Sequence, residues 1–185
     1  ATGEVVVRAP WLTQGYVAAP EASEGLWAGG YLHTADIGNI NPGGYLKVTD
    51  RIKDVIKTGG EWTSSLQLED IIAKHEAVHE VAVIGVADQL KGQVAMAFAV
   101  LKDPSLAQSD TEKLALEGEI MKIVDGQLGA VARPARVRFV NILPKTRSGK
   151  LLRRAIQAVC EGRDPGDLTT MDDPAALVQI KDLVG

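Results

Sequence analysis

The sequence predicts an α+β fold for most of the chain, on the strength of two observations. From about residue 51 onward, short runs rich in β-branched and apolar residues alternate with segments whose apolar residues recur at helical spacing. Two of the helical segments begin with a capping signal, a serine followed three residues later by Gln67 or Glu112. We therefore expect a short sheet flanked by helices over residues 51–185. Residues 1–50 are expected to be the incomplete C-terminal edge of another domain.

The first fifty residues predict strands joined by turns. The run from Gly3 to Arg8 predicts a strand, because it is β-branched and is bounded by Pro10. Residues 18–30, rich in Ala, Gly and Glu, are expected to form a loop. The Asn-Pro-Gly-Gly run at 41–44 predicts a turn that leads into a strand over 44–48.

The remaining elements follow from periodicity. A helix is expected after Ser64, and a second helix after Ser109. The second helix is expected to end where Pro134 breaks it. Strands are expected over 78–86, 94–100 and 137–143, with a loop over 88–93. The strand over 94–100 alternates bulky residues with alanines that admit close helix packing. A last helix begins at Asp173–Pro174. The two expected apolar stripes are Leu68, Ile71, Ile72 and His75, and Leu116, Ile120, Ile123 and Leu128.

The bulk composition narrows the class of protein. With 185 residues, 45% hydrophobic and 24% charged, the chain can bury a core and resembles ordinary globular proteins. A net charge of −4 argues against a general nucleic-acid binder. No apolar run approaches the ~20 residues that span a bilayer, so no transmembrane segment is expected. The single cysteine, Cys160, excludes an internal disulfide and fits a reducing compartment, which predicts a cytoplasmic location.

Two further expectations concern the chain ends and metals. The first residues show neither an initiator methionine nor a signal-peptide pattern, so we expect the chain to begin inside a larger protein. The three histidines, His33, His75 and His79, have no ligand spacing and only one cysteine to accompany them. No metal site is expected from these residues.

The first of two basic stretches runs from Asp50 to Trp62. It places Arg51, Lys53 and Lys57, followed by a glycine pair, in what we expect to be a connector between elements. Glycines let a backbone approach a ligand closely, because no Cβ intervenes. The alternative is a solvated hairpin with ordinary surface lysines.

The second basic stretch is the run Pro-Lys-Thr-Arg-Ser-Gly-Lys-Leu-Leu-Arg-Arg at 144–154. Its Ser-Gly-Lys segment lacks the earlier glycine that a Walker phosphate loop requires. Such a charge run is also typical of a basic helix start that faces solvent, and of a surface patch for anionic lipids. The patch would consist of Lys145, Arg147, Lys150, Arg153 and Arg154.

Together these stretches resemble the hinge motif and the catalytic-lysine loop of AMP-forming acyl-CoA synthetases, members of the adenylate-forming enzyme superfamily. Three N-terminal features add to the resemblance: Gly3-Glu4, Gly15-Tyr16, and a Tyr-x-Thr-Gly-Asp motif at 31–36 in which Ala35 replaces the glycine. The resemblance implies that residues 1–50 close the large N-terminal domain. It also implies that residues 51–185 form the mobile C-terminal domain, which swings between an adenylation pose and a thioester-forming pose.

The resemblance also assigns residue roles. Lys150 would stabilise charge on the phosphoryl oxygens during adenylation, and Lys57 would face the acyl-adenylate in the second pose. Asp36 would grip the ribose of ATP, since its two oxygens can accept from both hydroxyls. Arg51 would contact the nucleotide, and Lys53 would be the hinge pivot. Gly59 and Gly60 would line the coenzyme A tunnel, with Trp62 where acetyl-CoA synthetases carry an arginine near a CoA phosphate.

The implied reaction uses ATP, coenzyme A and a carboxylic acid, with Mg²⁺ held by ligands outside this chain. The run from Gly59 to Ser65 is typical of medium- and long-chain fatty acyl-CoA synthetases, whereas residues 166–177 resemble acetyl- and propionyl-CoA synthetases. We favour a fatty acid as substrate because Trp62 lies near the site, with a short-chain acid as the alternative.

Three expectations concern the chain on its own and its partners. It should be catalytically incomplete without the N-terminal domain of its parent. A stand-alone nucleotide- or CoA-binding regulatory module and a lipid-surface protein remain rival interpretations. Acylation of Lys150 would cancel its charge, so the resemblance implies a lysine acetyltransferase and a deacetylase as partners.

Overall fold

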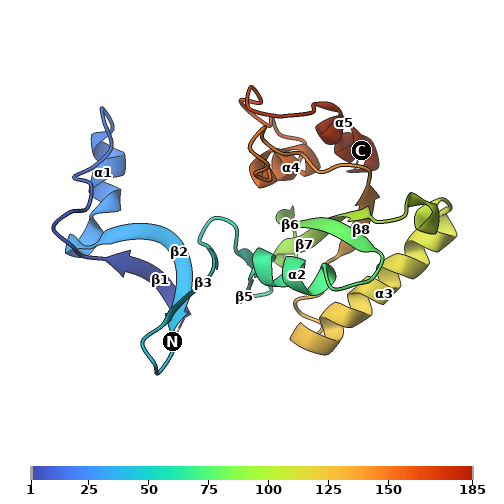
Figure 1. Ribbon diagram of the computed structural model, residues 1–185, viewed down its shortest axis with the longest axis horizontal. Helices are drawn as coiled ribbons and strands as arrows, with labels where there is room; N and C mark the ends of the chain where they lie inside the picture. The colour runs from blue at the N-terminus through green and yellow to red at the C-terminus, as the bar shows by residue number, and fades with distance from the viewer. Residues whose placement is uncertain (1, 185) are drawn as a thin grey trace. The chain divides into compact units, whose positions relative to one another are not determined.

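The computed structural model describes residues 2–184, which form two compact units (Figure 1). The first unit ends at Asp54 and the second begins at Val55. Among the described residues, no helix combines the length and the apolar character needed to cross a membrane. The fold is of the expected α+β class.

The first unit is built on a three-stranded antiparallel sheet in the order β1 (Thr2–Val7), β2 (Leu32–Ile40) and β3 (Leu46–Arg51). The predicted turn at 41–44 joins β2 to β3. The Asn41 carbonyl accepts from the Gly44 N–H at 3.0 Å, and its side-chain Oδ1 accepts from the Tyr45 N–H at 3.0 Å. An asparagine whose side chain accepts from a backbone N–H a few residues on commonly stabilises a turn. The turn predicted at 41–44 is therefore confirmed.

The predicted loop over 18–30 is wrong, because it contains helix α1 (Pro20–Leu26) and a 3-10 turn over Ala28–Gly30. Pro20 stands in the first turn, where its fixed φ suits a helix start. The Ser23 hydroxyl ties this start down, accepting from the Tyr16 N–H and donating to the Ala19 carbonyl, both at 2.8 Å. The helix has seven residues and buries none of them. An apolar stripe was therefore absent from the sequence.

The second unit contains a five-stranded sheet in the order β5 (Glu61–Thr63), β4 (Ile56–Thr58), β7 (Gly92–Leu101) and β6 (Val78–Asp88), with β8 (Arg136–Val140) parallel to β7. The strands predicted over 78–86 and 94–100 are confirmed as parts of β6 and β7. These two strands pair antiparallel along almost their whole length. The strand predicted over 137–143 is shorter, since β8 ends at Val140.

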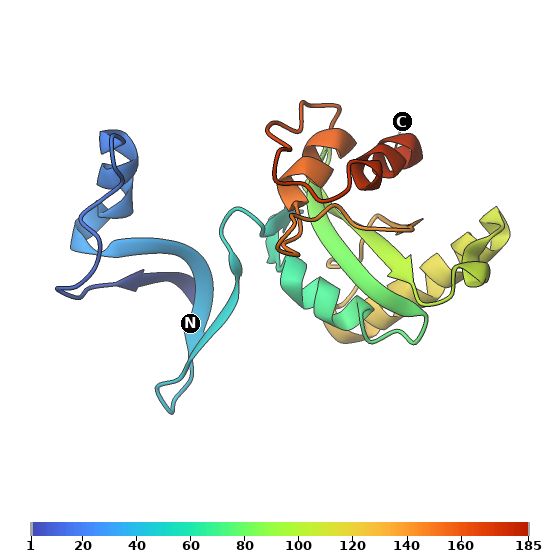
Figure 2. The ribbon, with the colours of Figure 1, turned by 45° about the horizontal axis from the view of Figure 1, so that its top comes forward.

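Helices cover both faces of this sheet, α2 (Ser65–Ile72) and α3 (Asp110–Leu128) on one and α4 (Arg153–Cys160) and α5 (Ala175–Val184) on the other (Figures 1 and 2). Alternate residues of β7 divide between the two faces. Its alanines at 95, 97 and 99 pack in the α2–α3 core, while Phe98 packs with Ile156 and Ile180 in the α4–α5 core. The predicted division into a bulky face and an alanine face is thus confirmed.

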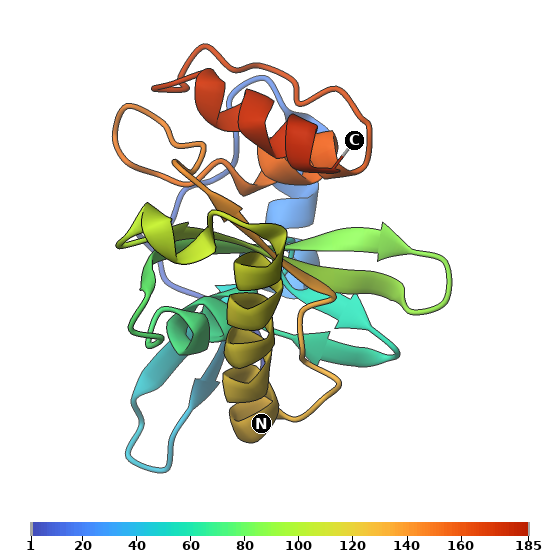
Figure 3. The same ribbon diagram turned by 90° about the vertical axis from the view of Figure 1, so that its right-hand side faces the viewer.

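Both predicted helix starts are capped by their serines, and the complete capping box is shown at Ser109. The Ser64 hydroxyl accepts from the Gln67 N–H at 3.1 Å, and Ser109 forms a complete capping box with Glu112. Helix α3 then crosses the face of the sheet (Figure 3) and buries Leu116, Ile120 and Val124.

Two expected helix ends are wrong. Helix α2 ends at Ile72, before His75, whose ring is nevertheless buried and accepts from the Ala77 N–H at its Nδ1. Helix α3 ends at Leu128 and not at Pro134. Gly129 follows it with a φ of 80° and a ψ of 168°, an extended conformation of positive φ that ends the helix and that only glycine adopts at little steric cost.

Helix α4 lies in a segment where the sequence predicted no definite helix. Its first residue anchors it to α2, since the Arg153 guanidinium bonds both carboxylate oxygens of Glu69, at 2.6 and 3.2 Å. Glu69 Oε1 also accepts from the Val83 N–H of β6 at 2.8 Å. One carboxylate therefore links two helices and a strand.

Replacing Glu69 with alanine should lower the free energy of unfolding of the second unit by about 2–3 kcal/mol. The side chains of Arg153 and Glu69 are only 22% and 12% exposed, so the substitution leaves a largely buried guanidinium without its carboxylate. Urea titration followed by circular dichroism would measure the loss.

The control for this prediction is Lys113→Ala, which breaks the Lys113–Asp110 pair on the surface of α3. Its two side chains are 44% and 97% exposed. A change within about 0.5 kcal/mol is expected there, since exposed ion pairs contribute little. Equal effects of the two substitutions would contradict the prediction.

Candidate functional site

Asp36 and Arg51 form a cross-strand pair in the first unit. They are register partners on β2 and β3, and Arg51 Nε lies 3.2 Å from Asp36 Oδ1. The Asp36 side chain is 29% exposed and that of Arg51 is 53% exposed. The structure thus brings together the two residues predicted to contact a nucleotide, and it leaves both accessible from solvent. Asp36 lies within strand β2.

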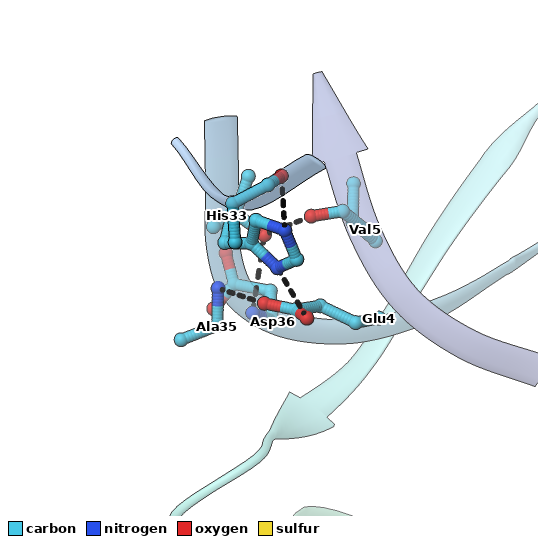
Figure 4. Close-up of polar contacts among 7 residues, drawn as sticks. Glu4, Val5, His33, Ala35 and Asp36 are labelled. Carbon is cyan, nitrogen blue, oxygen red and sulfur yellow. Dashed lines mark hydrogen bonds and ion pairs between the residues drawn. The ribbon is translucent and has the colours of Figure 1, made fainter. Parts of the chain in front are cut away.

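The backbone before Asp36 is strained. Ala35 has a φ of 58°, in the left-handed region that glycine occupies readily and alanine does not. The motif that this segment resembles carries glycine at this position. Alanine therefore adopts here a conformation that glycine would adopt at lower cost, and the cost must be offset by the surrounding contacts (Figure 4).

Four of the other predicted site residues lie in one hairpin of the second unit. Strands β4 and β5 pair Lys57 with Trp62, and Gly59 and Gly60 form the two-residue loop between them. Both glycines have positive φ, 58° and 88°, as a type I′ hairpin turn requires. The Gly59 N–H donates to the Lys91 carbonyl at 3.0 Å, which holds the loop against the β6–β7 turn.

Lys57 and Trp62 contact each other across this hairpin. The Lys57 ammonium lies 4.9 Å from the centre of the Trp62 ring, within cation–π distance. Trp62 is 62% exposed, and Lys57 is also exposed. The expectation that residues 50–62 form one connector is wrong. Asp50 and Arg51 are the last residues of β3, and residues 56–63 form the solvated hairpin that was given as the alternative. Only residues 52–55 connect the two strands β3 and β4.

Lys53 lies in that short connector. The Asp54 N–H donates to the Arg51 carbonyl at 2.9 Å, so residues 51–54 form a turn. The Lys53 side chain is exposed, and Lys53 is the next-to-last residue of the first unit.

Lys150 lies at the end of a tight loop that the backbone itself stabilises. The Thr146 N–H donates to the Lys150 carbonyl at 2.9 Å, and the Lys150 N–H donates to the Thr146 hydroxyl at 3.1 Å. Gly149 occupies the left-handed region with a φ of 82°. The Lys150 side chain is exposed, and among residues 2–184 no hydrogen bond or ion pair involves its ammonium. The loop therefore presents a free cation on an ordered backbone.

The segment around Thr170 and Asp172 forms further backbone hydrogen bonds with the Lys150 loop. The Arg147 N–H donates to the Thr170 carbonyl at 3.1 Å, and the Asp172 N–H donates to the Lys145 carbonyl at 2.9 Å. The Lys145 ammonium forms an ion pair with Glu80 of β6. The conformation of the loop is thus independent of the Lys150 side chain.

These contacts weaken the lipid-patch interpretation. Of its five cations, Lys145 is paired with Glu80 and Arg153 with Glu69. The remaining three, Arg147, Lys150 and Arg154, are exposed and form no ion pair within the described part of the chain. The sequence did not reveal the roles of Glu69 and Glu80. The only hint of a carboxylate partner in the sequence was Arg153, the arginine that ends the Pro-Lys-Thr-x-Ser-Gly-Lys-Leu-x-Arg pattern.

The structure also describes the single thiol and the side chains that could ligate a metal. Burial raises the pKa of Cys160 to about 11, which keeps the thiol protonated and unreactive near neutral pH. Among residues 2–184, no three His, Cys, Asp or Glu side chains lie together as metal ligands.

The α/β/α second unit, the glycine hairpin and the lysine loop define the C-terminal domain of an adenylate-forming enzyme. Residues 67–150 match the AMP-binding enzyme C-terminal domain family. The chain corresponds to the C-terminal part of AMP-forming acyl-CoA synthetases, as its relatives show.

It is 51% identical to the propionate–CoA ligase of Escherichia coli K12 over 148 residues, 80% of this chain and 24% of the ligase. It is 37% identical to the acetyl-coenzyme A synthetase of Pyrobaculum aerophilum over 184 residues, 97% of this chain and 27% of that protein. The ATP-bound crystal structure of MatB from Rhodopseudomonas palustris superimposes with a TM-score of 0.72 at 29% identity, covering 86% of this chain and 31% of MatB. The chain thus spans about a quarter of the curated relatives it matches.

Proposed function

We propose that this chain is the C-terminal part of an ATP-dependent ligase that joins a short-chain carboxylic acid, propionate or acetate, to coenzyme A. The observation that carries the proposal is the 51% identity to a propionate–CoA ligase over 80% of the chain. The tail at 166–177, which resembles short-chain enzymes, supports it.

The fatty-acid expectation gives way to this alternative. It depended on Trp62, which is 62% exposed on the β4–β5 hairpin and contacts Lys57. The relatives reported above, a propionate–CoA ligase and an acetyl-coenzyme A synthetase, favour the short-chain acid instead.

In the proposed first step, the carboxylate attacks the α-phosphate of ATP and pyrophosphate leaves. Negative charge develops on the phosphoryl oxygens, and an aligned cation stabilises it. We assign that cation to Lys150, because its ammonium is unpaired and its loop is held by backbone bonds. Asp36 and Arg51 would bind the nucleotide from the first unit, where they already form a pair. Mg²⁺, held by ligands outside this chain, would supply further neutralisation of phosphate charge when bound.

In the proposed second step, the thiol of coenzyme A displaces AMP from the acyl-adenylate. We assign Gly59 and Gly60 to the passage of the pantetheine arm, since a loop without Cβ atoms admits a ligand close to its backbone. Lys57 and Trp62 would flank that passage. The change between the two steps would turn on Lys53, in the short connector between the units. Acylation of the accessible Lys150 side chain, through its deprotonated amine, by a lysine acetyltransferase and its reversal by a deacetylase would switch the first step off and on.

The substrate assignment is tested by comparing propionate, acetate and octanoate with the full-length ligase that contains this chain. We expect kcat/KM for propionate to exceed that for octanoate by at least about 100-fold, because a pocket closed around a short chain excludes several added methylenes. Coupled detection of AMP release would measure all three. A preference for octanoate would overturn the short-chain assignment and restore the fatty acid.

A further inference from the structure

Glu4 and His33 lie beside Asp36 and have no role in the reaction proposed above (Figure 4). We propose that they are positioning residues for Asp36: the imidazolium of His33 holds the Glu4 carboxylate, and that carboxylate holds the bulged backbone that carries Asp36. The pair would make nucleotide binding depend on pH. This inference rests on the nucleotide-binding role proposed for Asp36.

The backbone around Asp36 departs from a regular ladder. Glu4 pairs with Ile37 and Val6 pairs with His33, so one residue of β1, Val5, faces three residues of β2, 34–36. Such a bulge turns a side chain away from the direction that the regular strand would give it. The left-handed Ala35 lies at its centre. A bulge of this kind needs partners for the backbone groups that the ladder leaves unpaired.

Four of these backbone groups have identified partners. The Ala35 N–H donates to Glu4 Oε1 at 3.1 Å, and the Asp36 N–H donates to the Thr34 hydroxyl at 3.1 Å. The Thr34 hydroxyl in turn donates to the Val5 carbonyl at 2.7 Å. The Ala35 carbonyl accepts from the Ile52 N–H at 2.9 Å. In this set, the bond to Glu4 is the one made by an ionisable side chain.

His33 contacts the second carboxylate oxygen of Glu4. Its Nδ1 lies 2.8 Å from Glu4 Oε2, and its Nε2 lies 3.0 Å from the Ala28 carbonyl. Both neighbours are acceptors, and only the protonated ring donates from both nitrogens. Glu4 is thus held between the imidazolium and the Ala35 N–H. The contact joins β1, β2 and the 3-10 turn at Ala28–Gly30.

The hydrogen bond to Glu4 and then the bond to the Ala28 carbonyl raise the pKa of His33 above its ordinary value. Because the pKa is raised in the folded state, the clamp is complete below about pH 6.5. It is lost as the pH rises through the pKa of the folded state. The first unit should therefore hold Asp36 most firmly at mildly acidic pH.

The other ionisable groups near His33 leave Glu4 as its charged partner. In the described part of the chain, Asp36 of β2 pairs with Arg51 of β3, and the Arg8 guanidinium after β1 lies over the Tyr31 ring. Asp50 of β3 is buried and accepts from the Arg51 N–H. The carboxylates of Glu21 and Glu24 on α1 are exposed, and neither contributes to the shift of His33.

The first test uses this chain and NMR titration between about pH 5 and pH 9. The amide signal of Ala35 should titrate with the same midpoint as the ring signals of His33. Glu4→Gln should lower the His33 midpoint and remove the response of the Ala35 amide. The matched control is Glu24→Gln, which neutralises an exposed carboxylate of the same unit and should leave both unchanged. The exposed His79 of β6 serves as an internal reference. If the chemical shift of the Ala35 amide does not change as His33 titrates, the proposal is wrong.

The second test measures the KM for ATP of the full-length ligase against pH. In the wild type, KM should rise by about tenfold as His33 loses its proton, the effect expected for one charge-assisted hydrogen bond. Glu4→Gln and His33→Gln should raise KM at low pH and flatten the profile, with kcat less affected. Asp36→Asn tests the underlying function separately. An unchanged KM in Asp36→Asn refutes the nucleotide-binding role, whereas a raised KM there with wild-type behaviour in Glu4→Gln refutes the clamp alone.

Discussion

Replacing Lys150 with alanine should slow formation of the acyl-adenylate by at least about 100-fold in the full-length ligase, as removal of one aligned charge-stabilising donor does in other enzymes. The reason lies in the loop: its backbone is held by Thr146 and by the segment around Thr170, while the Lys150 ammonium is unpaired. The substitution therefore removes a charge without disturbing the fold. Thioester formation from pre-made acyl-adenylate should be far less affected, because the proposed change of pose would withdraw Lys150 from the reacting atoms in that step.

Arg147→Ala is the matched control for this prediction. It removes an exposed cation from the same loop, three residues before Lys150. Adenylation and thioester formation can be followed separately, by pyrophosphate exchange and by single-turnover release of AMP. Equal losses of both half-reactions in Lys150→Ala, or an equal loss of adenylation in Arg147→Ala, would refute the assigned role.

Replacing Lys53 with proline should block one half-reaction and spare the other. Proline fixes φ at about −65°, and Lys53 lies in the turn closed by the bond from the Asp54 N–H to the Arg51 carbonyl. A chain that cannot rotate there would keep one pose. We expect adenylation to be kept and thioester formation to fall by at least about 100-fold, the cost of holding reacting groups in the wrong place.

Lys53→Ala separates rotation from charge, since it removes the ammonium and leaves φ free. It should retain most of both half-reactions. If Lys53→Pro slows both steps alike, or neither, the pivot lies at another residue. If Lys53→Ala reproduces the proline variant, the charge of Lys53 matters and its φ does not.

The sequence predicted the second unit better than the first. Residues close together in the chain specify the strands β6 and β7 and the caps at Ser64 and Ser109. Periodicity and capping patterns were therefore sufficient to predict these elements. Helix α1 was missed because it buries no residue and so shows no apolar stripe. The hairpin at 56–63 was given only as an alternative, since three-residue strands are too short for alternation to be distinctive.

The site residues were chosen from two local motifs, and the structure added their partners. Lys57 and Trp62 were assigned separately, but strand pairing placed the ammonium over the ring. Lys145 and Arg153 looked like members of one basic surface. The fold instead pairs them with Glu80 and Glu69, which are 65 and 84 residues away in the chain.

The sequence by itself determined the α+β class, the resemblance to adenylate-forming enzymes and the position of the exposed lysine loop, because each is written in contiguous residues. Only the tertiary structure decided which charges are neutralised and which stay free, and that Glu4 meets His33 across 29 residues to hold the bulge before Asp36. The physical reason is that an ion pair or a hydrogen bond acts over a few ångströms. Its partner is therefore chosen by the closing of the fold and not by neighbours along the chain.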